Sequence, residues 1–125
     1  MEIRKSAEDY LESILILSLR NGKVRSIDVA NELGFSKPSV SYAMKRFREN
    51  GLVNMDDSGY LALTASGMLV AQRVYERHMV LIDLLLAIGV TAETAKEDAC
   101  KLEHELSEET FARLQEYYNK NFEKK

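Results

Sequence analysis

Three side chains within a stretch of five residues could together hold a metal ion. Cys100, Glu103 and His104 stand at positions i, i+3 and i+4, a spacing that places a thiol, a carboxylate and an imidazole on one face of a helix. One of the two histidines and the only cysteine of the chain fall in this stretch. Mixed nitrogen, oxygen and sulfur ligands suit first-row divalent metals, whereas Ca²⁺ or Mg²⁺ would favour oxygen alone. The spacing therefore predicts a candidate transition-metal site.

Further ligands could come from Asp9, Glu12 and His78. Asp9 and Glu12, at i and i+3, put two carboxylates on one face of the first expected helix. Each candidate also has an ordinary role. Acids in a first turn complement the helix dipole, and a lone cysteine packs as a small apolar side chain. A lone histidine is most often a partly buried residue whose hydrogen bonds are satisfied, and a lone glutamate usually lies on a solvated helix face. The grouping of residues, rather than any one of them, favours a metal site.

A second constellation points to DNA. Residues 37–48 contain four cations and no acid, and the apolar residues of this stretch follow a helical period that should face a core. Short polar side chains and cations then point outward, as in a recognition helix that approaches the major groove and its phosphates. The outward set is Lys37, Ser39, Ser41, Tyr42, Lys45 and Arg46. The alternative is a mildly basic surface helix of a protein–protein module.

Capping residues mark the elements that would position these side chains. The expected helices are 7–21 after Ser6, 27–33 after Ser26, 37–50 after Ser36, 65–88 after Thr64, 92–106 after Thr91 and 110–118 after Ser107. Two β-like runs, 52–55 and 60–63, flank a turn-rich linker of hairpin length. Two short helices around Gly34, followed by a hairpin, predict a winged helix-turn-helix.

Composition places the protein among soluble, cytoplasmic chains. The net charge of −3 lies in the second half, because residues 1–63 contain nine basic and nine acidic residues and residues 64–125 contain eight and eleven. No apolar run reaches the ~18–20 residues that span a bilayer, and the N-terminus lacks a signal-peptide pattern. A single cysteine cannot form an internal disulfide and fits a reducing compartment. We expect no membrane association.

Four separated motifs resemble the diphtheria toxin repressor family of metal-dependent repressors. They are Glu8-Asp9-Tyr10-Leu11-Glu12, Ser36-Lys37-Pro38-Ser39-Val40-Ser41, Glu76-Arg77-His78 and Cys100-Lys101-Leu102-Glu103-His104-Glu105-Leu106-Ser107. The resemblance extends from about Ser6 to Leu114 and implies dimerisation and metal activation. Carried over by position, it implies a ligand set of Asp9, Glu12, His78, Cys100, Glu103 and His104.

The implied ligands match two different subgroups of that family. Asp9 and Glu12 are similar to the manganese-responsive regulators, whereas Cys100 matches the iron-responsive ones. Ile82 and Lys96 stand where the iron-responsive subgroup has ligands of an ancillary site, and the chain ends before an SH3-like domain, which resembles the compact manganese type. The expected ion is Mn²⁺ or Fe²⁺, with Zn²⁺ or Co²⁺ as substitutes in vitro.

These expectations combine into a mostly α-helical protein with two domains. Residues 1–72 would form the winged helix-turn-helix and residues 73–125 a helical metal-binding and dimerisation domain, with the boundary inside the fourth helix. An apolar stripe could serve a homodimer or close the monomer's own core; it comprises Leu102, Leu106, Phe111, Leu114 and Tyr118. An ion held by ligands from both halves would switch the affinity for operator DNA.

The resulting hypothesis is a metal-dependent transcriptional repressor of metal homeostasis genes. One alternative is a winged-helix regulator without metal control, and another is a structural Zn²⁺ site. A metallohydrolase using Glu103 or Glu12 as a general base is disfavoured, because the chain has no phosphate loop, nucleophile elbow or His-Glu-x-x-His motif. We therefore expect a DNA-binding protein and not an enzyme.

Overall fold

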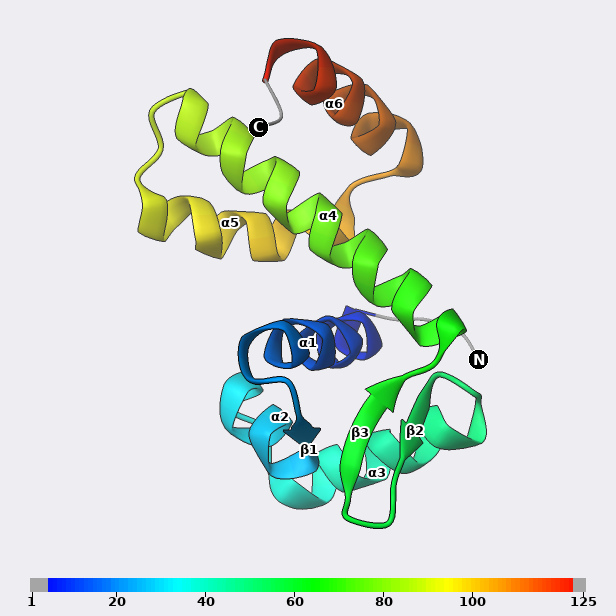
Figure 1. The fold of residues 1–125 in the computed structure, drawn as a ribbon. Helices are drawn as coiled ribbons and strands as arrows, with labels where there is room; N and C mark the ends of the chain where they lie inside the picture. Colours follow the sequence, from blue (N-terminus) through cyan, green and yellow to red (C-terminus); the bar gives the residue numbers. More distant parts are fainter. Residues whose placement is uncertain (1–4, 123–125) are drawn as a thin grey trace. The chain divides into compact units, whose positions relative to one another are not determined.

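The computed structural model describes residues 5–122, which divide into two compact units between Arg73 and Val74. The first unit contains α1 (Lys5–Asn21), β1 (Val24–Arg25), α2 (Ser26–Leu33), α3 (Lys37–Glu49), β2 (Val53–Met55) and β3 (Tyr60–Leu63) (Figure 1). The helix α4 (Ala65–Ala87) passes from the first unit into the second, which also contains α5 (Ala92–Glu105) and α6 (Glu108–Asn121). None of the described helices is long and apolar enough to cross a membrane.

A three-stranded antiparallel sheet forms the wing of the first unit. Its strand order is β1-β3-β2, with Val53 opposite Leu63 and Met55 opposite Leu61. The predicted hairpin is confirmed, but β1, which pairs Val24 with Leu61, was not predicted from the sequence. A strand of two residues shows no alternation, so nothing in the local pattern identifies it.

Helix boundaries confirm most of the predicted caps and correct others. Ser36 caps α3 by accepting a hydrogen bond from the Ser39 amide, and Gly34 ends α2 in the left-handed region at φ 71°. Ser26 is not a cap, because α2 begins at this residue and the Asp28 carboxylate instead accepts from the Arg25 amide at 2.9 Å. Ser6 is likewise wrong as a cap, since it lies inside α1.

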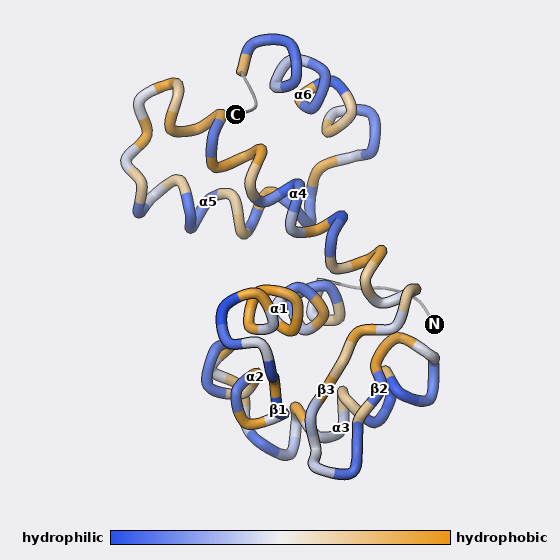
Figure 2. The backbone as a smooth tube through the Cα atoms, viewed as in Figure 1, coloured by the Kyte–Doolittle hydropathy of each residue, from blue (hydrophilic) through white to orange (hydrophobic). Residues whose placement is uncertain are grey.

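The first unit is built on an apolar core. Its fully buried large side chains come from every helix of the unit and from two strands; they are Leu11, Ile14, Val24, Val29, Val40, Met44 and Val53. Tyr10 adds edge-on aromatic contacts to Phe35 and Phe47, at centroid distances of 5.4 and 5.8 Å. Hydrophobic stretches recur along α1 and β3 in Figure 2, which follows from the helical and two-residue periods of these segments.

The start of α4 fastens the wing within the first unit. The Thr64 hydroxyl donates to the Gly51 carbonyl at 2.6 Å and accepts from the Gly67 amide at 3.1 Å, which confirms Thr64 as a cap. A Cβ atom at position 67 would overlap the Leu52 carbonyl, so the close approach of the helix to the wing requires glycine there.

The second unit agrees with the predicted helices except at two ends. Ser107 caps α6 by accepting from the Thr110 amide at 3.1 Å, whereas Thr91 occupies the cap position of α5 without a side-chain bond. The helix α6 continues to Asn121, beyond the predicted end near Tyr118. Tyr118 explains the extension, because it stacks on Phe122 at 4.8 Å and donates to Asp83 of α4 at 2.6 Å. The mostly α-helical class with an N-terminal winged helix-turn-helix is confirmed.

Candidate metal centre and DNA-binding surface

Three predicted metal ligands come together within the second unit. His78 lies on α4, and Cys100 and Glu103 lie one turn apart on α5. One donor atom from each residue can be chosen so that all three lie within 4.8 Å of one another. The spacing of α5 predicted that Cys100 and Glu103 share a face, but the approach of His78 depends on how the two helices pack.

The Glu103 carboxylate is the centre of this cluster. Glu103 is 2% exposed, and its Oε2 lies 2.8 Å from His78 Nδ1 while its Oε1 lies 3.2 Å from His104 Nε2. With Glu103 ionised, the His78 N–H is the donor of that hydrogen bond. The Oε1 atom is buried, and because its contact to His104 lacks hydrogen-bond geometry, no described residue donates a hydrogen bond to it. A buried carboxylate with an unsatisfied oxygen needs compensating positive charge, which protonated imidazoles or a bound cation can supply.

The residues present fit a divalent transition metal. Imidazole, carboxylate and thiolate donors converge from two helices, and this donor set suits first-row metals rather than Ca²⁺ or Mg²⁺. Cys100 is exposed at the side of the cluster, so an ion could be exchanged with solvent. When bound, the ion would supply the positive charge that the buried carboxylate requires.

Asp9 and Glu12 lie in the first unit, one turn apart on α1. Asp9 is half-buried and Glu12 is buried. Because they belong to the other unit, their participation as ligands remains a prediction.

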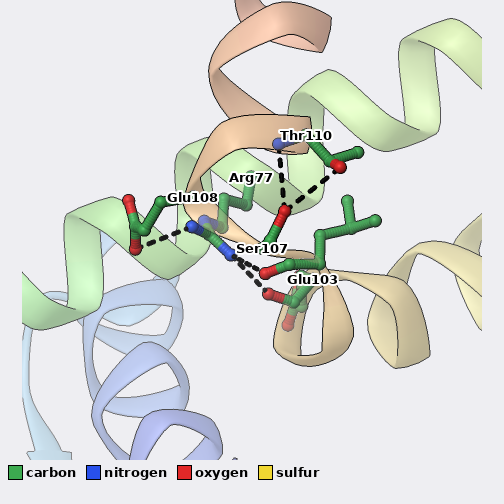
Figure 3. Close-up of polar contacts among 6 residues, drawn as sticks. Arg77, Glu103, Ser107, Glu108 and Thr110 are labelled. Carbon is green, nitrogen blue, oxygen red and sulfur yellow. Dashed lines mark hydrogen bonds and ion pairs between the residues drawn. The ribbon is translucent and has the colours of Figure 1, made fainter.

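Sequence reasoning gave no role to Arg77, the neighbour of His78. Its buried guanidinium donates through Nη1 to the Glu103 and Leu106 carbonyls, at 3.2 and 3.3 Å, and through Nη2 to the Glu108 carboxylate at 3.1 Å (Figure 3). It also lies 4.8 Å from the centroid of the Phe111 ring. The motif Glu76-Arg77-His78 contained the signal, but the partners of Arg77 are 26 to 31 residues away.

The outward face of α3 has the predicted composition. Val40, Met44 and Phe47 are buried and Ala43 is half-buried, as the helical period predicted. All six predicted DNA-contacting residues are exposed; they are Lys37, Ser39, Ser41, Tyr42, Lys45 and Arg46. Arg46 donates to the Tyr42 hydroxyl at 3.4 Å, and this hydrogen bond raises the pKa of the Arg46 guanidinium. The face therefore presents the Arg46 cation hydrogen-bonded to the exposed Tyr42, together with the hydroxyls of Ser39 and Ser41.

A second basic group on the wing was missed because β1 was missed. Lys23 Nζ and Arg25 Cζ lie 4.9 and 4.5 Å from the centroid of the Tyr60 ring. Both cations are exposed, and β1 pairs with the strand that bears Tyr60. The first unit therefore has exposed positive charge on its sheet as well as on α3.

Two family models match the chain in succession. Residues 2–62 match the N-terminal DNA-binding domain of iron-dependent repressors, and residues 64–123 match the metal-binding and dimerisation domain of iron-dependent repressors.

Individual relatives agree with these matches. The transcriptional regulator MntR of Escherichia coli O157:H7 is 40% identical over 107 residues, covering 86% of this chain and 69% of that protein. An uncharacterised HTH-type transcriptional regulator of Methanocaldococcus jannaschii is 33% identical over 118 residues, covering 93% of this chain and 94% of that protein.

Solved structures show the same architecture. The manganese regulator SloR superposes with a TM-score of 0.75 at 32% identity, covering 95% of this chain and 55% of that chain. IdeR of T. acidophilum superposes with a TM-score of 0.79 at 28% identity, covering 94% and 55%. The chain thus spans about half the length of these solved proteins.

Proposed function

This chain belongs to the iron-dependent repressor family of metal-dependent transcriptional regulators, and we propose that Mn²⁺ is the ion to which it responds. The relatives are regulators, which confirms the prediction that the chain is not an enzyme. The family does not favour the alternatives of a regulator without metal control or a structural Zn²⁺ site. The observation that carries the proposal is the grouping of His78, Cys100 and Glu103 in the part of the chain that matches the metal-binding domain.

We assign six ligands to the metal centre. His78, Cys100, Glu103 and His104 would hold the ion from the helical unit, and Asp9 and Glu12 would complete the site from α1. Support for Mn²⁺ over Fe²⁺ comes from the carboxylates in this set, since harder oxygen ligands favour Mn²⁺, and from the manganese regulators among the relatives. The Cys100 thiolate favours Fe²⁺, Co²⁺ or Zn²⁺, so these ions are the competitors to test.

The DNA-binding surface is α3. Ser39 and Ser41, near the helix N-terminus, are short enough to let the backbone approach base edges, and Lys37, Lys45 and Arg46 would contact phosphates. A homodimer would place two such helices about one DNA turn apart, ~34–36 Å. The exposed apolar edge of α5 at Leu102, together with the half-buried Phe111 and Leu114 of α6, supports self-association through the second unit.

The domains and the compartment complete the proposal. Residues 1–72 would act as the DNA-binding domain and residues 73–125 as the metal-binding and dimerisation domain. The proposed repression of genes through operator DNA would take place in the cytoplasm.

Metal-dependent DNA binding tests the proposal directly. DNA selected in vitro by the Mn²⁺-loaded protein serves as the probe, and fluorescence anisotropy gives the affinity with Mn²⁺, anaerobic Fe²⁺, Co²⁺, Zn²⁺ or chelator. Mn²⁺ should tighten binding by roughly 5–150-fold, and DNA must tighten Mn²⁺ binding by the same factor. Glu103→Gln should remove this coupling, whereas Glu116→Gln on the exposed side of α6 should retain it. Equal DNA affinity with Mn²⁺ and with chelator would overturn the proposal.

The role of α3 has its own test. Arg46→Gln should weaken binding to all sequences alike and reduce the slope of log K against log salt by about 1, because one phosphate contact is lost. Arg113→Gln, an exposed cation of α6, serves as the control and should leave the slope unchanged. A wild-type slope for Arg46→Gln would exclude this residue from the phosphate contacts.

A further inference from the structure

Arg77 holds together the end of one helix and the start of the next. The last turn of α5 leaves its carbonyls without partners in the helix, and the first turn of α6 favours a negative charge. Arg77 donates to the Glu103 carbonyl of this turn, to the carbonyl of the C-cap residue Leu106, and to the Glu108 carboxylate in the first turn of α6. Figure 3 shows its side chain reaching from α4 to the junction of α5 and α6.

Arg77 and its partners lie close in the sequence to the candidate metal ligands, and one of them, Glu103, is itself such a ligand. His78 directly follows Arg77 on α4, and the Glu103 carbonyl belongs to the residue whose carboxylate is the centre of the cluster. A movement of Arg77 would therefore shift His78 and Glu103 relative to each other. The 2.8 Å contact between His78 Nδ1 and Glu103 Oε2 depends on the same packing of α4 against α5.

From this geometry, and resting on the proposed metal-dependent function, we propose that Arg77 is a positioning residue of the metal centre. It sets the distance between His78 and Glu103 before the ion binds. It also couples the position of the last turn of α5 to that of α6. Its guanidinium suits this task because it presents several donors in a rigid fork, whereas a lysine ammonium is a single point of charge on a flexible stem. The nearby Phe111 ring fixes the plane of the fork from α6.

The test compares Arg77→Lys with Arg113→Lys. The first change keeps the charge but removes the fork, and the second makes the same change in an exposed pair on α6, where Arg113 is 75% exposed. Calorimetry gives the Mn²⁺ affinity of the intact protein, the absorption spectrum of the Co²⁺-loaded protein reports ligand geometry, and circular dichroism gives the unfolding midpoint without metal. Arg77→Lys should bind Mn²⁺ at least about tenfold more weakly and alter the Co²⁺ spectrum, as removal of other groups that orient metal ligands does. Arg113→Lys should match wild type.

A merely structural role would lower the unfolding midpoint and leave the Mn²⁺ affinity and the Co²⁺ spectrum of the folded protein unchanged, and that result would overturn the proposal. If Arg77→Lys does not fold, Glu108→Gln takes its place, because Glu108 is largely exposed and its substitution removes only one partner of Arg77. It should weaken Mn²⁺ binding by about two- to fivefold, and wild-type affinity would then overturn the proposal. Failure of the wild-type protein itself to bind Mn²⁺ would instead refute the proposed function.

Discussion

The two units of this protein are stabilised by different kinds of contact. The first unit has a core of large apolar side chains from α1, α2, α3 and the sheet. Among the described residues of the second unit, the buried apolar side chains are fewer and include no aromatic ring; they are Val74, Val80, Leu81, Ala95 and Ala99. No residue of α6 is buried, and this helix is largely hydrophilic in Figure 2. Polar contacts of Arg77, Glu103 and Tyr118 join the helices of the second unit instead.

The difference indicates where a ligand can act. A close-packed apolar core gains stability without any bound group, whereas a buried carboxylate between two imidazoles leaves a charge to be compensated. The second unit also exposes apolar side chains on α4 and in the turn that follows it, including Met79, Leu86 and Ile88, the last 77% exposed. Its stability should therefore depend more strongly on metal and on a second copy of the chain than that of the first unit, which would supply only Asp9 and Glu12 to the ion.

The largest expected effect is in the core of the first unit. Phe47→Ala should lower the free energy of unfolding by about 3–5 kcal/mol, because it leaves a cavity beside Tyr10. Urea unfolding followed by circular dichroism should give the same loss with Mn²⁺ and with chelator. Tyr42→Ala, on the exposed face of the same helix, should stay within about 0.5 kcal/mol of wild type. A loss for Phe47→Ala that depends on Mn²⁺ would contradict the contrast between the units.

Metal should stabilise the second unit by the next largest amount. At a free Mn²⁺ concentration of about 100 times Kd, the gain should be about 2.7 kcal/mol, since the ion binds only the folded state. Scanning calorimetry should show this gain in wild type and in Glu116→Gln, and should lose it in Glu103→Gln. Chelation should lower the transition temperature and leave the protein folded. An equal gain in Glu103→Gln would place the ion elsewhere.

A smaller effect should come from the link between α4 and α6. Tyr118→Phe removes the hydrogen bond to Asp83 and should cost about 1.5 kcal/mol, the lower value for a bond to a charged group. Tyr117→Phe, in a neighbouring residue that is 58% exposed, should change stability by less than about 0.5 kcal/mol.

The hydrogen bond between Tyr118 and Asp83 also predicts that the stability of the protein depends on pH in the alkaline range. The hydrogen bond to Asp83, with a smaller contribution from burial, raises the pKa of Tyr118. The folded state thus keeps the phenolic proton to higher pH than the unfolded state, so the contribution is complete below a pH of about 10 and is lost as pH rises through the folded pKa. Urea unfolding from neutral to alkaline pH should show the difference between wild type and Tyr118→Phe shrinking above that point. A constant difference would assign the stability to packing alone.

Local patterns predicted much of this structure because their causes are local. Ser36 and Ser107 act as caps, Gly34 ends a helix, and the period of α3 separates its buried and exposed faces, all through residues within one or two turns. For the metal centre, the spacing of Cys100 and Glu103 was sufficient to predict their shared face. The approach of His78 was implied only by the family resemblance, because it depends on how two helices pack and brings together residues 25 positions apart in the sequence.

The features that the sequence did not predict depend on distant partners. The strand β1 exists because Val24 and Arg25 pair with β3, more than thirty residues away. Arg77 acts on carbonyls at the end of another helix, and carbonyl groups are present at every residue, so no side-chain pattern identifies these acceptors. Ser26 has the same local signal as Ser36 but is not a cap, since α2 begins at Ser26 itself and the cap position falls on Arg25, whose amide donates to the Asp28 carboxylate.

The smallest expected effect distinguishes two residues, Ser107 and Thr91, that the sequence predicted alike as helix caps. Ser107 accepts a hydrogen bond from the Thr110 amide, so Ser107→Ala should destabilise the second unit by about 1 kcal/mol. Thr91 has extended backbone at the start of α5 but makes no capping bond, so Thr91→Ala should change stability by only about 0.5 kcal/mol or less. Urea unfolding of the metal-free protein measures both. Equal losses would mean that Thr91 caps α5 in solution and that the start of α5 is as firmly held as the start of α6. A larger loss for Ser107→Ala would show that the firmer helix start lies beside the Arg77 contacts, where Glu108 follows the capping serine.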